Sequence, residues 1–262
     1  MKTIWHGWLL SLQFLTVIPI RKEINWQPAT ARWSVRCFPI VGLLIGGILA
    51  GWYSFFSSFT SVSPLFLSIS LLWLSIFLSG GLHADGWMDV SDAFFSYRDV
   101  ARRQEIMKDS RVGAFAVLSI MFLLSFRFLF MYETIGSHVS VMFFVLIPLL
   151  SRGFMALLLI YGRLAKATGM AAAFREHVFK RDAYVVIAIL LFWLVSISVG
   201  VPYVFEKLVM LTAGALVCFL GARSFCEKQF GGITGDMLGA FVEGVETWLW
   251  FIIWLLHFFD TV

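Results

Sequence analysis

Residues 80–115, GGLHADGWMDVSDAFFSYRDVARRQEIMKDSRVGAF, determine the architecture because they place many charges between two long apolar runs. The apolar runs are residues 64–82 and residues 112–132. A helix of about 17 to 25 apolar residues crosses the hydrocarbon core of a bilayer. The charged segment therefore lies at a membrane boundary. Its basic residues are confined to its second half, after a first group of aspartates.

The composition is that of a polytopic membrane protein. Hydrophobic residues make up 60% of the chain, charged residues make up 14%, and the mean hydropathy is +0.87. Soluble domains contain roughly 45–50% apolar and about 25% charged residues, so a soluble fold is excluded. The net charge of +4 indicates loops that contact anionic lipid, and it does not require a nucleic-acid partner. The cysteines form no CxxC pair, which indicates neither a disulfide framework nor a zinc site.

Eight apolar runs are expected to be helices, because lipid offers no partner for an unpaired backbone group. Seven of them approach or exceed the length of a membrane span. The first run is short and contains polar residues; it either crosses the membrane or lies in the interface as an amphipathic helix. The runs are residues 4–20, 38–59, 64–82, 112–132, 139–161, 183–201, 208–225 and 240–259. We expect one all-α domain, residues 1–262, folded as a polytopic bundle of about seven or eight helices.

Basic residues alternate between the connections, which predicts an orientation. Four connections are basic and are expected on the cytoplasmic side, as the positive-inside rule requires. The intervening connections contain a single basic residue, Lys207. The basic connections are residues 21–36, 98–111, 163–181 and 223–228. We therefore expect a multi-pass protein of the bacterial cytoplasmic membrane with its active site facing the cytoplasm.

Asp85, Asp89 and Asp92 share one face of the helix that residues 82–97 are expected to form. Their i, i+4, i+7 spacing places them within an arc of about 60°. Carboxylates this close repel one another, so a cation is expected to offset their charge. Mg²⁺ is commonly bound by one or two carboxylates together with water and phosphate oxygens. The spacing therefore predicts a magnesium site on this face.

The basic block that follows the acids is expected to bind phosphate. The first three aspartates cluster on one helical face, and the bases follow as a block from Arg98 to Arg111, which favours metal on the acids and phosphate on the bases. The alternative is a solvated loop in which acids and arginines pair with one another. Gly86 directly follows the first aspartate and permits a close approach of another backbone or of a phosphate. We place His83 and Ser96 close to the same face.

A second patch, FGGITGD at residues 230–236, precedes the last apolar helix. Glycines before a helix expose backbone N–H groups that suit an anion. Asp236 is either a further metal ligand or a helix cap.

Several charges also lie within apolar runs, where charged side chains usually face the interior of a bundle. Arg127 is interpreted as the structural partner of an acid, whereas Arg152 is a candidate phosphate contact. Glu243 and Glu246 are either functional or paired with bases.

Four blocks of the chain resemble the cobalamin synthases, also called adenosylcobinamide-GDP ribazoletransferases. The blocks are GGLHADGWMDVSDAFFS, RRQEIMKDSRVGAF, SRGFMALLL and FGGITGDMLGAFVE, and the segments LQFLTVIPI and RWSVRCFPIVGLLIGG resemble the family's early part. The resemblance covers nearly the whole chain in order. The chain departs from the family's common residues at Ala84, Ala93 and Gln104, and none of these changes removes a charge.

The resemblance implies a membrane enzyme that joins adenosylcobinamide-GDP to α-ribazole or to its 5′-phosphate. The products are adenosylcobalamin or its 5′-phosphate, and GMP, and the cofactor is Mg²⁺. Under this interpretation Asp85, Asp89 and Asp92 are catalytic residues and metal ligands, and Asp236 completes the metal site. The candidate substrate contacts are Arg36, His83, Glu105, Lys108, Asp109, Arg111 and Arg152. We also expect contact with membrane lipid, and either a homo-oligomer or a complex with other enzymes of nucleotide-loop assembly.

Three other interpretations remain. The CDP-alcohol phosphatidyltransferases also begin their motif with Asp-Gly, but the match fails after Asp85 and Gly86. A cation or cobalt transporter would place acids in the middle of several spans, whereas these acids gather at one boundary. A scaffold with a degenerate site would not be expected to keep the acids intact.

Overall fold

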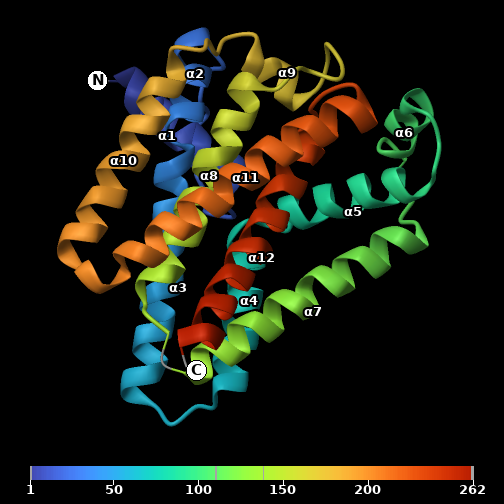
Figure 1. The fold of residues 1–262 in the computed structure, drawn as a ribbon. Helices are drawn as coiled ribbons and strands as arrows, with labels where there is room; N and C mark the ends of the chain where they lie inside the picture. The colour runs from blue at the N-terminus through green and yellow to red at the C-terminus, as the bar shows by residue number, and fades with distance from the viewer. Residues whose placement is uncertain (1, 110, 138, 261–262) are drawn as a thin grey trace.

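A computed structural model describes residues 2–109, 111–137 and 139–260 (Figure 1). These residues form α-helices and one short 3-10 helix, with a single isolated parallel bridge between Leu164 and Ile233. The all-α expectation is confirmed. The elements are α1 Lys2–Leu15, α2 Pro28–Arg36, α3 Phe38–Phe59, α4 Pro64–Leu78, α5 Leu82–Phe95, α6 Val100–Ile106, α7 Ala114–Gly136, α8 Met142–Tyr161, α9 Met170–Arg175, α10 Asp182–Gly200, η1 Pro202–Val204, α11 Phe205–Phe230 and α12 Gly235–Asp260.

Six of the helices in the described residues are long and apolar enough to span a membrane: α3, α7, α8, α10, α11 with η1, and α12. The pair α4 and α5 meets the same test only when taken together, and the two helices meet at 89°. Figure 1 shows the expected alternation: the basic connections lie in the upper half, and the α3–α4, α7–α8 and α10–α11 turns lie in the lower half.

The first apolar run does not form a span. The sequence is compatible with a crossing or an interfacial position for residues 4–20, and in the structure α1 ends at Leu15 after 14 residues. That length is below the roughly 17 residues that a crossing needs. The helix instead packs beside α2, and the Phe14 ring lies 5.2 Å from that of Phe174 on α9. This arrangement matches the non-crossing alternative.

The run predicted over residues 64–82 is interrupted. Helix α4 ends at Leu78, and the chain turns through Gly80 and Gly81 at φ of 65° and 73°. Consecutive left-handed residues cannot continue a right-handed helix, and only glycine adopts this conformation without cost. The break turns α5 away from α4. Helix α5 is not among the six helices that meet the spanning test on their own, and it runs across the bundle (Figure 1).

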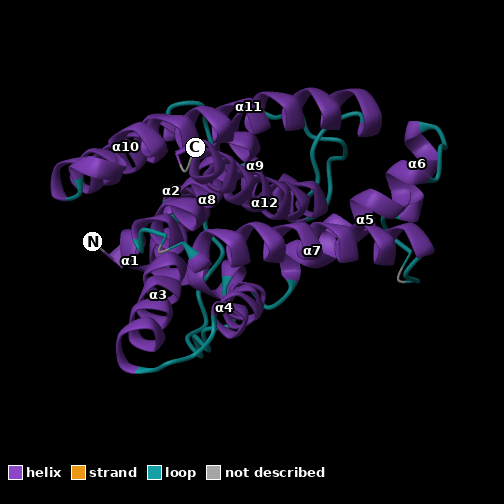
Figure 2. Ribbon diagram, turned by 60° about the horizontal axis from the view of Figure 1, so that its bottom comes forward, coloured by secondary structure: helices purple, strands orange, loops and turns teal. Residues whose placement is uncertain are grey.

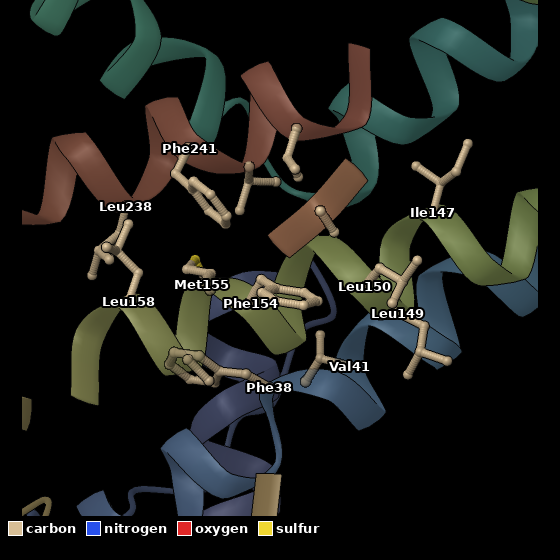
Figure 3. Packing of buried hydrophobic residues seen from close by; sticks show 14 of the residues in the cluster. Phe38, Val41, Ile147, Leu149, Leu150, Phe154, Met155, Leu158, Leu238 and Phe241 are labelled. Carbon is tan, nitrogen blue, oxygen red and sulfur yellow. The ribbon is translucent and has the colours of Figure 1, made fainter. Parts of the chain in front are cut away.

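Helix α8 is the centre of the bundle and is buried along almost its whole length. Figure 3 shows Phe154 and Met155 of α8 between Phe38 of α3 and Phe241 of α12. On the α3 side the backbones meet closely, because a Cβ atom at Gly46 would lie 2.7 Å from the Cα of Val145. Small residues allow spanning helices to pack by direct backbone contact.

Buried ion pairs join α7, α8 and α12. The Arg127 guanidinium on α7 donates to Glu243 at 2.6 Å and lies 3.5 Å from Glu246, both on α12. Arg152 on α8 donates to Glu246 and to the Ser151 hydroxyl. The prediction that Arg127 pairs with an acid is confirmed. Figure 2 shows the result, with α12 lying between α11 and α7.

Replacing Gly46 by alanine is expected to lower stability by about 1–3 kcal/mol, because the new methyl group overlaps the α8 backbone. Thermal unfolding in detergent micelles measures the loss. Gly47→Ala is the matched control, since a Cβ atom there meets nothing within 4 Å. Equal unfolding temperatures for the two variants would contradict the proposed contact.

Candidate active site

Asp85, Asp89 and Asp92 lie on one stripe of α5, as the spacing predicts. The residues are helical throughout, so the calculated arc of about 60° applies. Val90 lies on another face of α5 and is buried. Asp85 is exposed, while Asp89 and Asp92 are half-buried. The stripe of acids is therefore separate from the buried Val90 side of the helix.

Asp236 lies beside this stripe because α12 begins against α5. A side chain at Gly86 would overlap the Asp236 carbonyl group and lie 3.1 Å from its Cα. Further along, a Cβ atom at Gly239 would lie 3.1 Å from the Cα of His83. The two glycines allow the helix backbones to touch. The expectation that Gly86 permits the close approach of another backbone is confirmed. This contact brings Asp236, a fourth carboxylate, to the site.

The four carboxylates share one electrostatic environment. Partial burial, together with the charges of Asp85, Asp236 and Asp92, raises the pKa of Asp89 to about 6. Burial and neighbouring negative charge both disfavour the ionised form of a carboxyl group. A cation bound beside Asp89 would lower the pKa of this carboxyl group again.

The donor set fits a hard divalent cation such as Mg²⁺, which is bound by carboxylate oxygens and keeps several water or phosphate ligands. Among the described residues, no three Asp, Glu, His or Cys side chains converge into a complete ligand group. The aspartates are therefore neighbours without a closed shell, and the magnesium site remains a prediction.

The loop after α6 borders the acid stripe. The Asp92 carboxylate lies directly against Gly113, where any side chain would overlap it. Lys108 and Arg111 of this loop are exposed. Arg111 donates to Asp109 at 2.6 Å, and hydrogen bonds from its side chain and backbone lower the pKa of Asp109 to about 2.

The remaining predicted residue of this segment, Glu105, lies on α6 and pairs with Arg102. The pair measures 2.6 Å and is exposed at the surface. Exposed pairs of this kind contribute little stability. Residue 110 lies outside the described residues, so this segment is described at Lys108, Asp109 and Arg111.

Arg36 has a carboxylate partner far from the acid stripe. Its guanidinium donates to Asp182, which is fully buried at the start of α10, and stacks over the Trp33 ring at 4.5 Å. Arg32 lies 3.7 Å from the same carboxylate. This partner is 146 residues away in the chain and was not predictable from local sequence. In this structure Arg36 joins α2 to α10.

His83 and Arg152 are also away from the acids. Each is 2% exposed. Placing His83 near the acidic face was wrong, because two positions along a helix rotate a side chain by about 200°. His83 packs against α12 instead. Arg152 is engaged by Glu246 inside the bundle. Both residues belong to the interior contacts among α5, α8 and α12.

Sequence reasoning missed Lys166. The backbone N–H of Ala165 donates to Ile233 at 3.1 Å, and that of Ile233 donates to Arg163 at 2.7 Å. This parallel pairing carries the chain past Asp236, and the Lys166 ammonium interacts electrostatically with the Asp236 carboxylate. In the sequence, Lys166 is recognisable only as one of several basic residues in the connection 163–181, and nothing distinguishes it from the others.

The fold and site define a polytopic membrane protein with an aspartate cluster at its basic end, bordered by lysine and arginine from two loops. Residues 7–254 match the family model described as Cobalamin-5-phosphate synthase, and the chain belongs to this family. The resemblance seen in the sequence is thereby confirmed.

Named relatives cover nearly the full length of the chain. It is 65% identical over 260 residues to the adenosylcobinamide-GDP ribazoletransferase of Geobacillus sp. (strain WCH70), which covers 98% of both chains. It is 57% identical to that of Geobacillus thermodenitrificans, again over 98% of both chains. The enzyme of Clostridium tetani is 32% identical and covers 92% of this chain and 93% of its own. No solved structure matches the chain.

Asp182→Ala is expected to destabilise the protein by about 3–5 kcal/mol, because it leaves Arg36 and Arg32 without their buried partner. Thermal unfolding in detergent measures the effect. Glu105→Ala, which breaks an exposed pair, is the control and should cost at most about 1 kcal/mol. If Asp182→Ala unfolds like the control, Arg36 is not held by this carboxylate.

Proposed function

We propose that the chain is a membrane-bound transferase that joins adenosylcobinamide-GDP to α-ribazole, or to its 5′-phosphate. The products are adenosylcobalamin or its 5′-phosphate, and GMP. The match of residues 7–254 to the Cobalamin-5-phosphate synthase family carries this assignment. The named relatives and the aspartate cluster support it. A cation or cobalt transporter is not favoured, because the relatives are transferases.

The reaction is a substitution at phosphorus. A ribose hydroxyl of ribazole attacks the phosphorus bonded to the cobinamide side, a new P–O bond forms, and the P–O bond to GMP breaks. The hydroxyl proton passes to a base, and GMP leaves with its phosphate. Such transfers depend on positioning and on neutralisation of charge on the phosphate oxygens.

The aspartates supply the negative part of the site. We assign Asp85, Asp89, Asp92 and Asp236 as the residues that would hold Mg²⁺. The ion, when bound, would act as a Lewis acid that neutralises charge on the diphosphate and orients it. The closeness of the four carboxylates on α5 and α12 supports this assignment.

Cations on two sides of the aspartates would hold the diphosphate. Lys108 and Arg111 lie in the loop that contacts Asp92, and Lys166 interacts electrostatically with Asp236. Arginine can contact phosphate oxygens with two N–H groups, and lysine contacts them as a point charge. Asp109 pairs with Arg111 at the exposed surface. Of the other predicted contacts, Arg36 and Arg152 pair with buried carboxylates, and His83 is buried. We therefore assign these three residues a structural role and no direct contact with the substrate.

The site is proposed to face the cytoplasm across the bacterial cell membrane. The basic connections gather in the upper half of Figure 1, and the positive-inside rule assigns such connections to the cytoplasm. An opening on this side would let the large corrinoid reach the aspartates from water.

Purified protein incubated with adenosylcobinamide-GDP, α-ribazole and Mg²⁺ is expected to release GMP, which chromatography measures. EDTA should stop the release and added Mg²⁺ should restore it. Asp85→Asn keeps the shape of the side chain but removes its charge, and should lower the rate by at least about 100-fold. Asp99→Asn, at the N-cap of α6, is the matched control. Wild-type turnover by Asp85→Asn would remove this residue from the metal site.

Lys166→Met is expected to lower kcat/KM for adenosylcobinamide-GDP by about 10- to 100-fold, since it removes one charged contact to phosphate. Lys180→Met, at an exposed position in the same connection, should leave kcat/KM unchanged. Equal values for both variants would exclude Lys166 from the phosphate contacts, even if the chain proves to be the proposed transferase.

A further inference from the structure

The face of α5 opposite the aspartates borders two adjoining cavities of about 520 Å³ and about 810 Å³. The first lies among α5, α11 and α12, and the second among α5, α7 and α12. They share Trp87, Ser91, Phe95, Gly244 and Trp248. We call this combined space the lateral groove. None of the described residues that line it is charged.

Packing separates the lateral groove from the aspartates. Trp87 lies about 200° around α5 from Asp85. On one side, Gly86 contacts the Asp236 backbone and seals α5 against α12. On the other side, the Phe95 ring lies 5.6 Å from that of Phe115 and seals α5 against α7. A diphosphate held by the aspartates would not enter this apolar space.

The lateral groove is continuous with the lipid-facing surface of a spanning helix. Leu118, Phe122 and Phe126 of α7 line its mouth and are 49%, 63% and 51% exposed. Phe241 and Val245 of α12 line its depth and are 6% and 1% exposed. The groove therefore leads from the hydrocarbon to the interior of the bundle.

The end of the groove near the basic loops is covered by α6. The Arg103 guanidinium lies over the Phe94 ring at 5.3 Å and donates to the Gln229 side chain at 2.6 Å. Phe94 in turn lies 5.1 Å from the Phe225 ring. A ligand therefore enters from the side, between α7 and α11, and not from water.

We propose that the lateral groove binds an acyl chain of a membrane phospholipid, which packs against the reverse face of α5. The uncharged aromatic and aliphatic lining suits hydrocarbon, and lipid is what the mouth faces in a bilayer. The exposed Arg98 follows Tyr97 at the rim, so an anionic head group would lie beside a positive charge.

The test is photocrosslinking in reconstituted vesicles. The protein is placed in phosphatidylglycerol and phosphatidylethanolamine vesicles with a phosphatidylglycerol that carries a diazirine in its acyl chain. After irradiation, mass spectrometry maps the labelled residues. We expect label on Phe241 and Val245, which annular lipid does not reach. Label confined to outward residues such as Val217 would overturn the proposal.

Gly221→Phe is the test variant, because Gly221 lines the groove and a Cβ atom there meets nothing within 4 Å. It should fill the space and lose most of the label on Phe241 and Val245. Gly51→Phe on α3 is the control, since its surroundings are equally open, and it should keep the label. Both variants are first checked for wild-type thermal unfolding. Undiminished label in Gly221→Phe, or protection of these residues by α-ribazole, would reject a lipid site.

Discussion

Arg127 and Arg152 lie inside a membrane bundle, and the position of α12 depends on how their charges are satisfied. An unpaired charge in the hydrocarbon region is costly, and removing one member of a buried pair leaves the other uncompensated. Glu243 and Glu246 both come from α12. The helix must therefore stay in register with α7 and α8. This register sets the height at which Asp236 meets α5.

The position of α12 in turn determines where Asp236 lies relative to the aspartates of α5. Gly86 and Gly239 let the α5 and α12 backbones touch, so a shift of either helix would move Asp236 relative to the α5 stripe. The two basic loops are attached differently. Backbone hydrogen bonds to Ile233 hold the loop that carries Lys166, whereas an exposed pair with Asp109 holds Arg111. The backbone that carries Lys166 is thus held in place, whereas the exposed Arg111 can adjust to a ligand.

The sequence predicted those features that repeat along one helix or one span. Hydropathy located the spans, and the spacing of Asp85, Asp89 and Asp92 gave the acid stripe, because both depend only on local geometry. Contacts between distant segments were not predictable in this way. The Arg36–Asp182 pair and the bridge that positions Lys166 join residues far apart in the chain. The break at Gly80 was missed because the apolar run continues to Leu82. A hydropathy profile contains no information about backbone conformation.

The break also explains how a charged helix can follow an apolar one. Helix α4 has 15 residues, so at about 1.5 Å per residue it rises only about 22 Å, against a hydrocarbon core about 30 Å thick. The turn at Gly80 and Gly81 ends this rise, and the chain continues at 89° as α5. Because α5 does not extend the axis of α4, its carboxylates need not lie on a continuous span, and the helix can run beside α7 and α12 instead.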